Sequence, residues 1–179
     1  MTYILHNDNT ATVWSYEGTA TTLSFAVEGY TVTKIRERVF QNNTTLTSVT
    51  LPEGLLEIGD YAFSQCSKLQ TINLPEGLTA IREHAFYWCT QLQSIDLPDS
   101  LTTIETFAFY NTGLTSLIIP ANVTSIGHAA FHSINVQNIY VKRAEATENY
   151  DQGWHNRNTD DIIWNFKDFH TDAQGITYV

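Results

Sequence analysis

The chain repeats one motif at a nearly constant interval, and this repeat constrains the fold more than any other feature. The motif LPEGLLEIGDYAF (Leu51–Phe63) returns as LPEGLTAIREHAF (Leu74–Phe86), LPDSLTTIETFAF (Leu97–Phe109) and IPANVTSIGHAAF (Ile119–Phe131). Its closing phenylalanines, counted from Phe40, are spaced 23, 23, 23 and 22 residues apart. A period in the twenties indicates a solenoid, in which each turn of the chain, or rung, stacks on the previous one.

Each repeat contains a predicted strand. Apolar and polar residues alternate in LTSVTLP, LQTINLP and LQSIDLP, as in a strand with one buried face, and the following proline lacks an N–H for further pairing. A second extended piece, such as LTAI, leads to the Ala-Phe pair. Since one rung cannot bury its Leu, Ile and Phe side chains alone, the stacked rungs must share a core. One rung lacks a residue within 110–113, so we expect that deletion in a turn.

The predicted core consists of five columns that recur along the repeats. These are Phe40, Phe63, Phe86, Phe109 and Phe131; Ile35, Ile58, Ile81, Ile104 and Ile126; Leu46, Leu69, Leu92, Leu114 and Val136; Val49, Ile72, Ile95, Leu117 and Ile139; and Leu51, Leu74, Leu97, Ile119 and Val141.

The repeat LPEGLTAIREHAFYWCTQLQSI resembles that of the BspA-like leucine-rich repeat family of bacterial surface antigens, roughly C-x-x-L-x-x-I-x-L-P-x-x-L-x-x-I-x-x-x-A-F. The resemblance implies a mostly β, right-handed leucine-rich-repeat solenoid with one strand per rung on the concave face and a cap at each end. It also implies a non-catalytic binding or adhesion module of a bacterial cell-surface or secreted protein. The expected ligand is a protein, with a glycan as an alternative. An intracellular scaffold or regulatory interaction domain with the same fold is the alternative function.

We expect three segments. Residues 1–34 form an N-terminal cap with a β-hairpin and a degenerate first rung, residues 35–141 form the repeats, and residues 142–179 form a C-terminal cap containing GWHNRNTDDIIWNF. Terminal rungs of a solenoid are atypical because one face has no neighbour. The last stretch, DFHTDAQGITYV, indicates only a short strand after a turn at Gly175.

The charge balance excludes several classes of partner. Acidic residues outnumber basic ones 19 to 9, and the net charge of −10 repels phosphate backbones and anionic lipid surfaces. No apolar run reaches the length of a membrane-spanning helix. The N-terminus lacks the features of a secretion signal, which leaves a cytoplasmic protein or one whose signal has been removed. We expect a monomer without cofactors.

The sequence contains no convincing catalytic or metal-binding constellation. Cys66 and Cys89 share a column with Asn43 and Thr112, which favours packed, reduced thiols bonded to backbone over a disulfide or a metal site. His128 and His132 in HAAFH lack the glutamate of a zinc-protease helix motif, so we interpret them as structural or surface histidines.

Other acidic residues, and one more histidine, offer only weak alternatives. Glu57 and Asp60 lack the spacing of a calcium loop. A hydrolase that uses His155, Asp160 and Asp161 is the remaining enzymatic alternative, disfavoured because this region has the character of a cap.

Two surfaces are candidate binding sites. The first is the outward face of the predicted strands on the inner wall of the array, with Asn73, Asp96, Ile118 and Tyr140 in one column and Gln70, Gln93 and Gln137 in a neighbouring one. An aliphatic and an aromatic side chain beside amides are typical of the centre of an interface. Ile118 and Tyr140 have a second interpretation, in which they only cover the last rung or contact the C-terminal cap.

The second surface is a loop ridge formed by Tyr87, Trp88 and Tyr110 after the phenylalanines. Ser64 and Gln65 precede Tyr87 and Trp88 by one repeat, so the core does not require aromatic residues there. Packing against neighbouring loops is the alternative role for these side chains.

Overall fold

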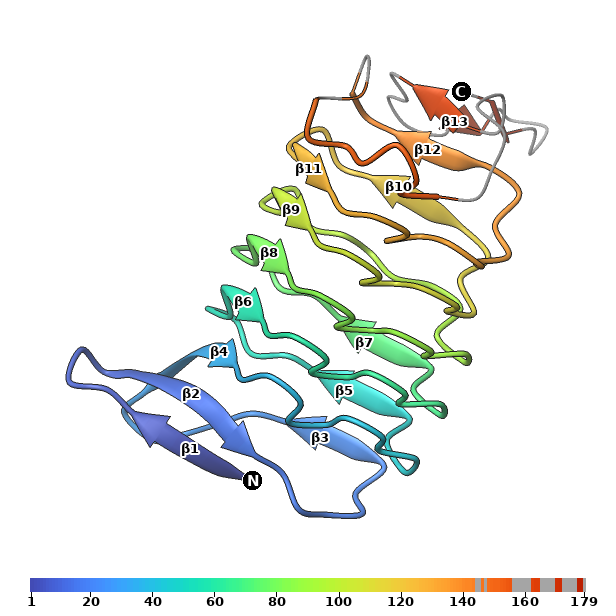
Figure 1. The fold of residues 1–179 in the computed structure, drawn as a ribbon. Coiled ribbons are helices and arrows are strands. Elements are labelled where there is room, and N and C mark those ends of the chain that lie inside the picture. Colours follow the sequence, from blue (N-terminus) through green and yellow to red (C-terminus); the bar gives the residue numbers. More distant parts are fainter. Residues whose placement is uncertain (144–145, 147, 156–161, 165–169, 172–176, 179) are drawn as a thin grey trace.

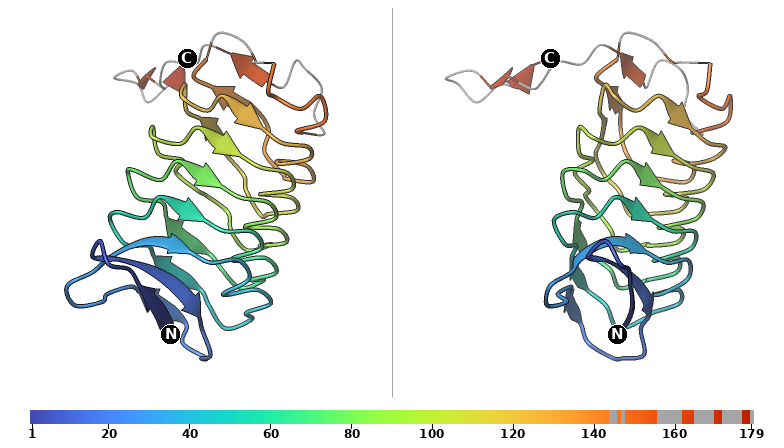
Figure 2. Two further views of the ribbon diagram at one scale, coloured as in Figure 1. Left: turned by 60° about the vertical axis from the view of Figure 1, so that its left-hand side comes forward. Right: turned by 90° about the vertical axis from the view of Figure 1, so that its left-hand side faces the viewer.

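The computed structural model describes residues 1–143, 146, 148–155, 162–164, 170–171 and 177–178. It shows an all-β solenoid of about six turns with rungs of about 23 residues, as the repeat predicts (Figure 1, Figure 2). In the part of the chain described here, no helix is long and apolar enough to cross a membrane.

One side of the solenoid carries a seven-stranded sheet in the order β1-β2-β4-β6-β8-β9-β11 (Figure 1). Its strands are β1 (Thr2–Leu5), β2 (Thr10–Ser15), β4 (Thr31–Ile35), β6 (Glu57–Ile58), β8 (Ala80–Ile81), β9 (Thr103–Ile104) and β11 (Ser125–Ile126). The β1–β2 hairpin is antiparallel and every later pair is parallel. The predicted isoleucine column pairs in register from Ile35 to Ile126, so this side is continuous.

A second side carries two shorter parallel sheets. The first contains β3 (Thr22–Ser24), β5 (Ser48–Thr50) and β7 (Thr71–Asn73), and the second contains β10 (Leu117–Ile119), β12 (Ile139–Val141) and β13 (Ile162–Trp164). A separate antiparallel pair is formed by β14 (His170–Thr171) and β15 (Thr177–Tyr178), the latter at the position of the predicted last strand. β3 and β4 already pair with the following rung, so the stacking begins before Ile35.

The strand predicted in LQSIDLP does not form, which corrects the expectation of one strand in every rung. Ser94–Asp96 belongs to no strand, and among the described residues no pairing joins it to β7 or β10. Aspartate is disfavoured in strands, and Asp96 stands where the preceding rung has Asn73. The rung that follows Ser94–Asp96 is the shortened one, so the turns of chain before and after this segment differ in length by one residue.

The third side consists of turns in which two positions of every rung have positive φ without glycine. These are Arg38, Tyr61, His84, Phe107 and Ala129 (φ 51–59°), and Asn42, Gln65, Trp88, Asn111 and Ser133 (φ 54–61°). The left-handed conformation turns the N–H along the solenoid axis: Tyr61 donates to the Glu83 carbonyl at 2.9 Å and Gln65 to the Tyr87 carbonyl at 2.6 Å. Rung-to-rung hydrogen bonds therefore offset the unfavourable backbone conformation.

The core contains a stack of the five predicted phenylalanines, with successive ring centroids 4.9–5.4 Å apart. Trp154 packs edge-on against the last of them, Phe131, at 6.0 Å. Almost all predicted core residues are buried. Leu74 and Leu97 are the exceptions: both pack against the core on one side but remain partly exposed, because they flank the unpaired segment Ser94–Asp96.

The shortened rung is accommodated at Gly113, in the turn where the deletion is predicted. The Gly113 N–H donates to the Cys89 carbonyl at 3.3 Å, and a β-carbon at this position would collide with the Thr90 carbonyl oxygen. A glycine is required because the shorter turn brings the two backbones this close.

Candidate binding wall

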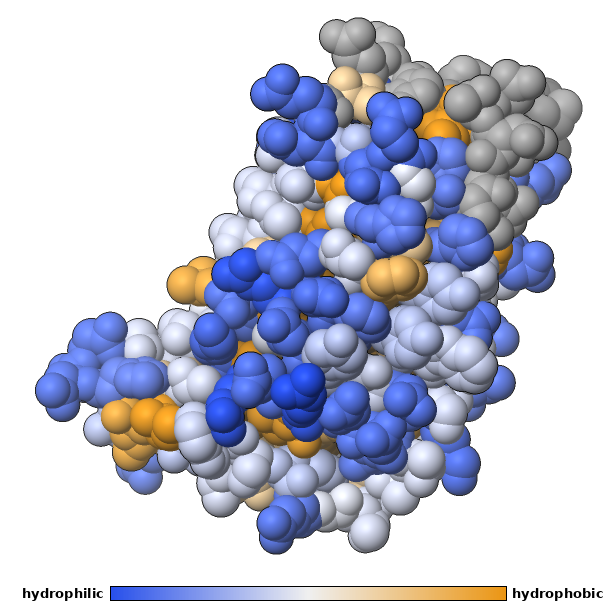
Figure 3. Space-filling model, in the orientation of Figure 1, coloured by the Kyte–Doolittle hydropathy of each residue, from blue (hydrophilic) through white to orange (hydrophobic). Residues whose placement is uncertain are grey.

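The predicted wall residues lie on one face of the solenoid, which we call the binding wall: the outward side of Ser48–Thr50, Thr71–Asn73, Ser94–Asp96, Leu117–Ile119 and Ile139–Val141. Asn73, Asp96, Ile118 and Tyr140 occupy equivalent positions in successive rungs, and the residue directly before each of them is buried. Most other side chains around them carry hydroxyl or amide groups. On the face shown in Figure 3, most of the surface is hydrophilic, with hydrophobic side chains scattered over it.

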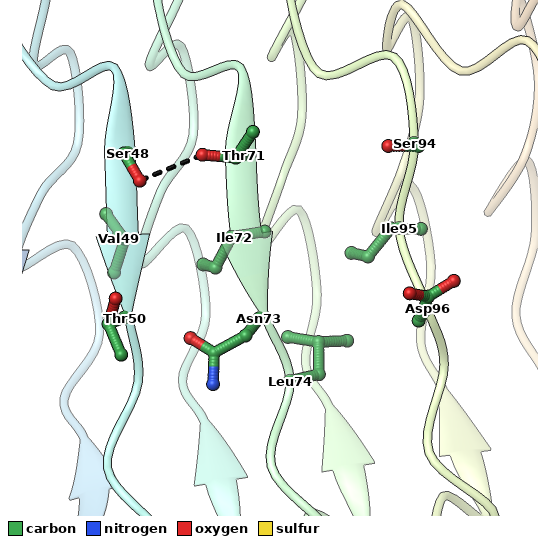
Figure 4. A pocket seen from close by; sticks show the side chains of 10 residues that line it. All are labelled: Ser48, Val49, Thr50, Thr71, Ile72, Asn73, Leu74, Ser94, Ile95 and Asp96. Carbon is green, nitrogen blue, oxygen red and sulfur yellow. Dashed lines mark hydrogen bonds between the residues drawn. The ribbon is translucent and has the colours of Figure 1, made fainter.

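A hollow of about 490 Å³ lies over the place where the strand pairing is interrupted. It extends from Ser48–Thr50 across Thr71–Leu74 to Ser94–Asp96, and Leu74 stands between Asn73 and Asp96 (Figure 4). A second hollow of about 180 Å³ continues on the other side of Asp96, where Leu97, Ile118 and Lys142 contribute to its lining. Asp96 therefore stands between two adjoining hollows.

The polar side chains at the first hollow also hold the rungs together. The Leu51 N–H donates to Asn73 Oδ1 at 2.7 Å, and Asn73 Nδ2 donates to the Leu51 carbonyl at 3.4 Å. Thr71 Oγ1 donates to Ser48 Oγ at 2.8 Å (Figure 4). Asn73 thus continues the ladder with its side chain, whereas the carboxylate of Asp96 has no N–H to donate.

An apolar row crosses the other end of the wall. Ile118 of β10 is in register with Tyr140 of β12, which is in register with Ile163 of β13. Ile118 and Tyr140 are partly exposed, and Asn138 Nδ2 donates to the Tyr140 hydroxyl at 3.4 Å. The two side chains reach the surface, as a binding site requires. Tyr140 also adjoins a strand of the C-terminal region, as the alternative role of contacting the C-terminal cap requires.

The predicted glutamines Gln70, Gln93 and Gln137 are exposed at the edge of the wall where the chain enters each rung's wall segment. Gln70 and Gln93 line a third hollow of about 350 Å³ together with Gln91 and Ser94, and Gln137 is exposed two rungs further on. These side chains present uncharged donors and acceptors.

The loop ridge is made mainly of aromatic side chains that contact one another. Tyr87 stacks on Tyr110 at 5.3 Å, and Tyr110 stacks on His132 at 5.5 Å, so both tyrosines adopt the packing role that was the alternative. Trp88 behaves differently: 47% of it is exposed.

A network of charged side chains on the seven-stranded side was missed in the sequence. Lys34 Nζ lies 2.8 Å from Glu57 Oε1, Arg82 Nη2 lies 3.2 Å from Glu57 Oε2, and Arg82 Nη1 lies 2.6 Å from Glu105 Oε1. Burial favours the neutral form of Glu57, but hydrogen bonds from Lys34 and Arg82 outweigh it and lower the pKa of that carboxyl. Glu57 is thus part of an ordered network of ion pairs.

A second missed feature is a row of stacked rings at the first positive-φ column. The His84 ring lies between Tyr61 at 4.5 Å and Phe107 at 4.9 Å, and the Arg38 guanidinium lies over Tyr61. His84 Nδ1 is 3.1 Å from Glu83 Oε1, without the angle of a hydrogen bond. Burial lowers the pKa of His84 more than Glu83 raises it.

The family of the chain follows from its repeats. The model of the BspA type leucine rich repeat region matches residues 15–144 in six copies. The chain belongs to this family. The family match covers most of the chain and confirms the resemblance predicted from the motif; no curated protein sequence matches.

Solved leucine-rich repeat proteins share this fold. A leucine rich repeat protein of Treponema pallidum is 28% identical, with a TM-score of 0.71, and the match covers 92% of this chain and 79% of that one. A leucine-rich repeat protein from Bacteroides ovatus is 26% identical, with a TM-score of 0.67 and coverage of 80% of this chain. The match spans 46% of the Bacteroides protein, so that protein is about twice as long as the matched region.

A third match is a leucine rich cell surface protein from Faecalibacterium prausnitzii. It is 27% identical, the match covers 98% of this chain and 57% of that one, and the TM-score is 0.45.

The two histidines of HAAFH have separate partners in this BspA-type solenoid. His128 Nδ1 contacts Asp151 Oδ1 at 3.0 Å, whereas His132 Nδ1 contacts Ser133 Oγ at 2.9 Å, so the pair does not converge. His155 packs on Trp154 at 4.3 Å, and Asp160 and Asp161 lie outside the described residues. Within the described ranges, no group of three or more His, Cys, Asp or Glu side chains could hold a metal ion.

Both cysteines of the repeats are free and buried, as predicted. The Cys66 thiol donates to the Phe40 carbonyl and the Cys89 thiol to the Phe63 carbonyl, each at 3.1 Å. Thr112 occupies the same column and donates to the Phe109 carbonyl at 3.1 Å.

Proposed function

We propose that this chain is a non-catalytic binding module that engages a protein ligand through the binding wall. The observation that carries the proposal is the interruption between β7 and β10, which opens two adjoining hollows and leaves apolar side chains partly exposed at their rims. Leu74, Leu97 and Ile118 supply an apolar centre, and hydroxyl and amide groups surround it. Interfaces commonly have this arrangement of an apolar centre and a polar rim.

The charge of the wall favours particular ligands. Asp96 lines both hollows, and Asp99 and Lys142 also line the second of them. The chain as a whole carries a net charge of −10, so a neutral or basic protein surface is the better complement. Such a ligand inserts an apolar side chain beside Leu74 and places a basic group near Asp96.

The cell surface or the outside of a bacterial cell is the proposed location of this activity. Membership of the BspA-type family supports this placement. An intracellular scaffold is the second candidate, and the two free cysteines favour it because disulfides are common in oxidising compartments. Fractionation of the native host separates the two: recovery on intact cells or in the medium supports the first, and recovery in the cytoplasm supports the scaffold.

The proposal is tested by a binding screen against immobilised extracellular-matrix proteins. A wall variant carries Asp96→Ala, Ile118→Ser and Tyr140→Ala. A control variant carries Glu28→Ala, Leu56→Ser and Trp14→Ala, which remove the same kinds of side chain from exposed positions away from the wall. Circular dichroism verifies the fold of both.

We expect the wall variant to lose binding and the control to keep it. Binding that survives in the wall variant overturns the wall as the site. Absence of binding to every protein of the screen contradicts the adhesion role and favours the scaffold.

A further inference from the structure

A hollow of about 420 Å³ lies beside Trp88, where the turns lead toward the binding wall. Three rungs line it, each with the residue of the second positive-φ column and the residue two positions later: Asn42 and Thr44, Gln65 and Ser67, and Trp88 and Thr90. None of these side chains ionises. The hollow thus places one indole beside the amides and hydroxyls of neighbouring rungs.

Neither the backbone nor the core explains a tryptophan at position 88. Its φ of 60° is a conformation that bulky residues rarely adopt, and its counterparts Asn42, Gln65, Asn111 and Ser133 are all polar. Its ring makes one tilted contact, with Tyr87 at 6.2 Å, and 47% of the residue is exposed. An exposed aromatic side chain at a backbone position that polar residues occupy in the other rungs is characteristic of a binding position.

We propose that this hollow, the Trp88 site, binds a neutral saccharide. The C–H bonds on one face of a pyranose ring carry partial positive charge and match the electron-rich face of the indole. The sugar hydroxyls both donate and accept, as do the amides of Asn42 and Gln65 and the hydroxyls of Thr44, Ser67 and Thr90. Successive rungs lie about 4.8 Å apart, a spacing suited to one sugar unit per rung.

The electrostatics select the class of saccharide. The lining is uncharged while the whole chain carries a net charge of −10, so sulfated and uronic-acid polymers are repelled. The neighbouring hollow lined by Gln70, Gln91 and Gln93 is also uncharged, which gives a longer chain further amide partners. The Trp88 site does not depend on the proposed function, because no residue of the binding wall lines it.

The test uses the indole N–H signals of the four tryptophans in a ¹⁵N-labelled chain, titrated with cellohexaose, laminarihexaose and mannohexaose. A high-mannose glycoprotein, with and without its glycan, distinguishes a protein-linked source from a free polysaccharide. A heparin hexasaccharide serves as the charged control. The Trp88→Asn variant supplies a residue suited to positive φ, so it keeps the fold while it removes the indole.

We expect at least one neutral hexasaccharide or the glycosylated protein to shift the Trp88 signal at millimolar concentration. In Trp88→Asn, where the backbone amide signals of Gln65 and Thr90 report binding, the affinity falls about tenfold or more. Trp14→Ala, which removes another exposed tryptophan, leaves the affinity unchanged. Gln65→Ala weakens it less, because one hydrogen bond is lost.

Three outcomes overturn the proposal. The first is that no neutral probe moves the Trp88 signal, and the second is that Trp88→Asn binds as well as the unmodified chain. The third is that the glycoprotein binds equally after its glycan is removed, which assigns the hollow to a protein ligand.

Discussion

The ring of Phe86 lies parallel to that of Phe63, with an interplanar angle of 1° and a centroid separation of 5.4 Å. Both rings are fully buried and belong to the stack that passes through the repeats. Because each rung shares its core only with its neighbours, loss of one ring leaves a cavity between two rungs. The contribution of one ring to the stability of the chain can therefore be measured.

Phe86→Ala is expected to lower the free energy of unfolding by about 3–5 kcal/mol. Urea unfolding followed by circular dichroism measures this change. Phe107→Ala is the matched control, since Phe107 lies partly exposed at the edge, and its loss should cost less than half as much. Equal losses at both positions would show that the stack does not dominate stability.

Arg82→Met removes both ion pairs of Arg82 while keeping most of its apolar stem. We expect a loss of about 1 kcal/mol near neutral pH, since the Arg82 side chain is 40% exposed and solvent screens the pairs. Lys68→Met, at an exposed position, should change stability little.

The effect of Arg82→Met should also depend on pH. The pKa of Glu57 is lowered in the folded state, so its contribution is present above the ordinary glutamate pKa of about 4.3 and is lost as the pH falls through the lowered value. Thermal unfolding at neutral and at strongly acidic pH should therefore show the difference between variant and unmodified chain shrinking in acid. A difference that is constant with pH contradicts the role of Glu57.

Trp88→Asn should raise the free energy of unfolding by about 1 kcal/mol, because asparagine tolerates positive φ better than tryptophan. Differential scanning calorimetry measures the change. Asn111→Ala is the control with the opposite expected sign. It replaces an asparagine in the same positive-φ column by alanine, so it should lower the free energy of unfolding. A less stable Trp88→Asn variant would mean that the indole contributes to packing.

The thiols of Cys66 and Cys89 should be unreactive in the folded chain. Burial raises the pKa of Cys66 to about 12 and that of Cys89 well above its usual range. Labelling with a maleimide should modify neither until denaturant is added, and Lys68→Cys supplies an exposed thiol that reacts at once. Since unfolded thiols titrate at about 8.5, stability should fall as the pH rises above that value. Rapid labelling of the folded chain would contradict this.

Gly113→Ala should destabilise the chain by about 1–3 kcal/mol, because the added methyl group meets the Thr90 carbonyl and one backbone must move. Chemical denaturation compares it with Gln91→Ala, an exposed position in the corresponding turn of the preceding rung. A neutral Gly113→Ala substitution would mean that the two turns separate at little cost.

The core was predictable because burial repeats with the period of the sequence. The columns of Phe40 and Ile35 could be found by alignment of the chain with itself, and the structure buries both. The same alignment places Glu57 beside Lys34, one period away, and Arg82 beside Glu105. The charged network is not visible along the chain, because its ion pairs join residues of different rungs.

The interruption at Ser94–Asp96 could not be predicted in this way. LQSIDLP has the same alternation as LQTINLP, and the two differ only at Ser94 and Asp96. Pairing there depends on whether a side chain such as Asn73 extends the ladder and on the shorter rung that follows. The shorter rung is visible in the 22-residue spacing from Phe109 to Phe131, but its effect on the pairing of Ser94–Asp96 depends on three-dimensional contact, and so does the bonding of the Asn73 side chain. The proposed roles of Asn73, Asp96 and Trp88 in binding stay predictions.

The contrast between the two sides has a mechanical consequence. The seven-stranded side is bonded without a break from β1 to β11, whereas the opposite side lacks strand pairing on either flank of Ser94–Asp96. When the solenoid is bent, the continuous sheet should hold the rungs together, and the rungs should separate first at the interruption. Resistance to extension is therefore unevenly distributed along this solenoid, and a pulled molecule should elongate first between the rungs of Asn73 and Ile118.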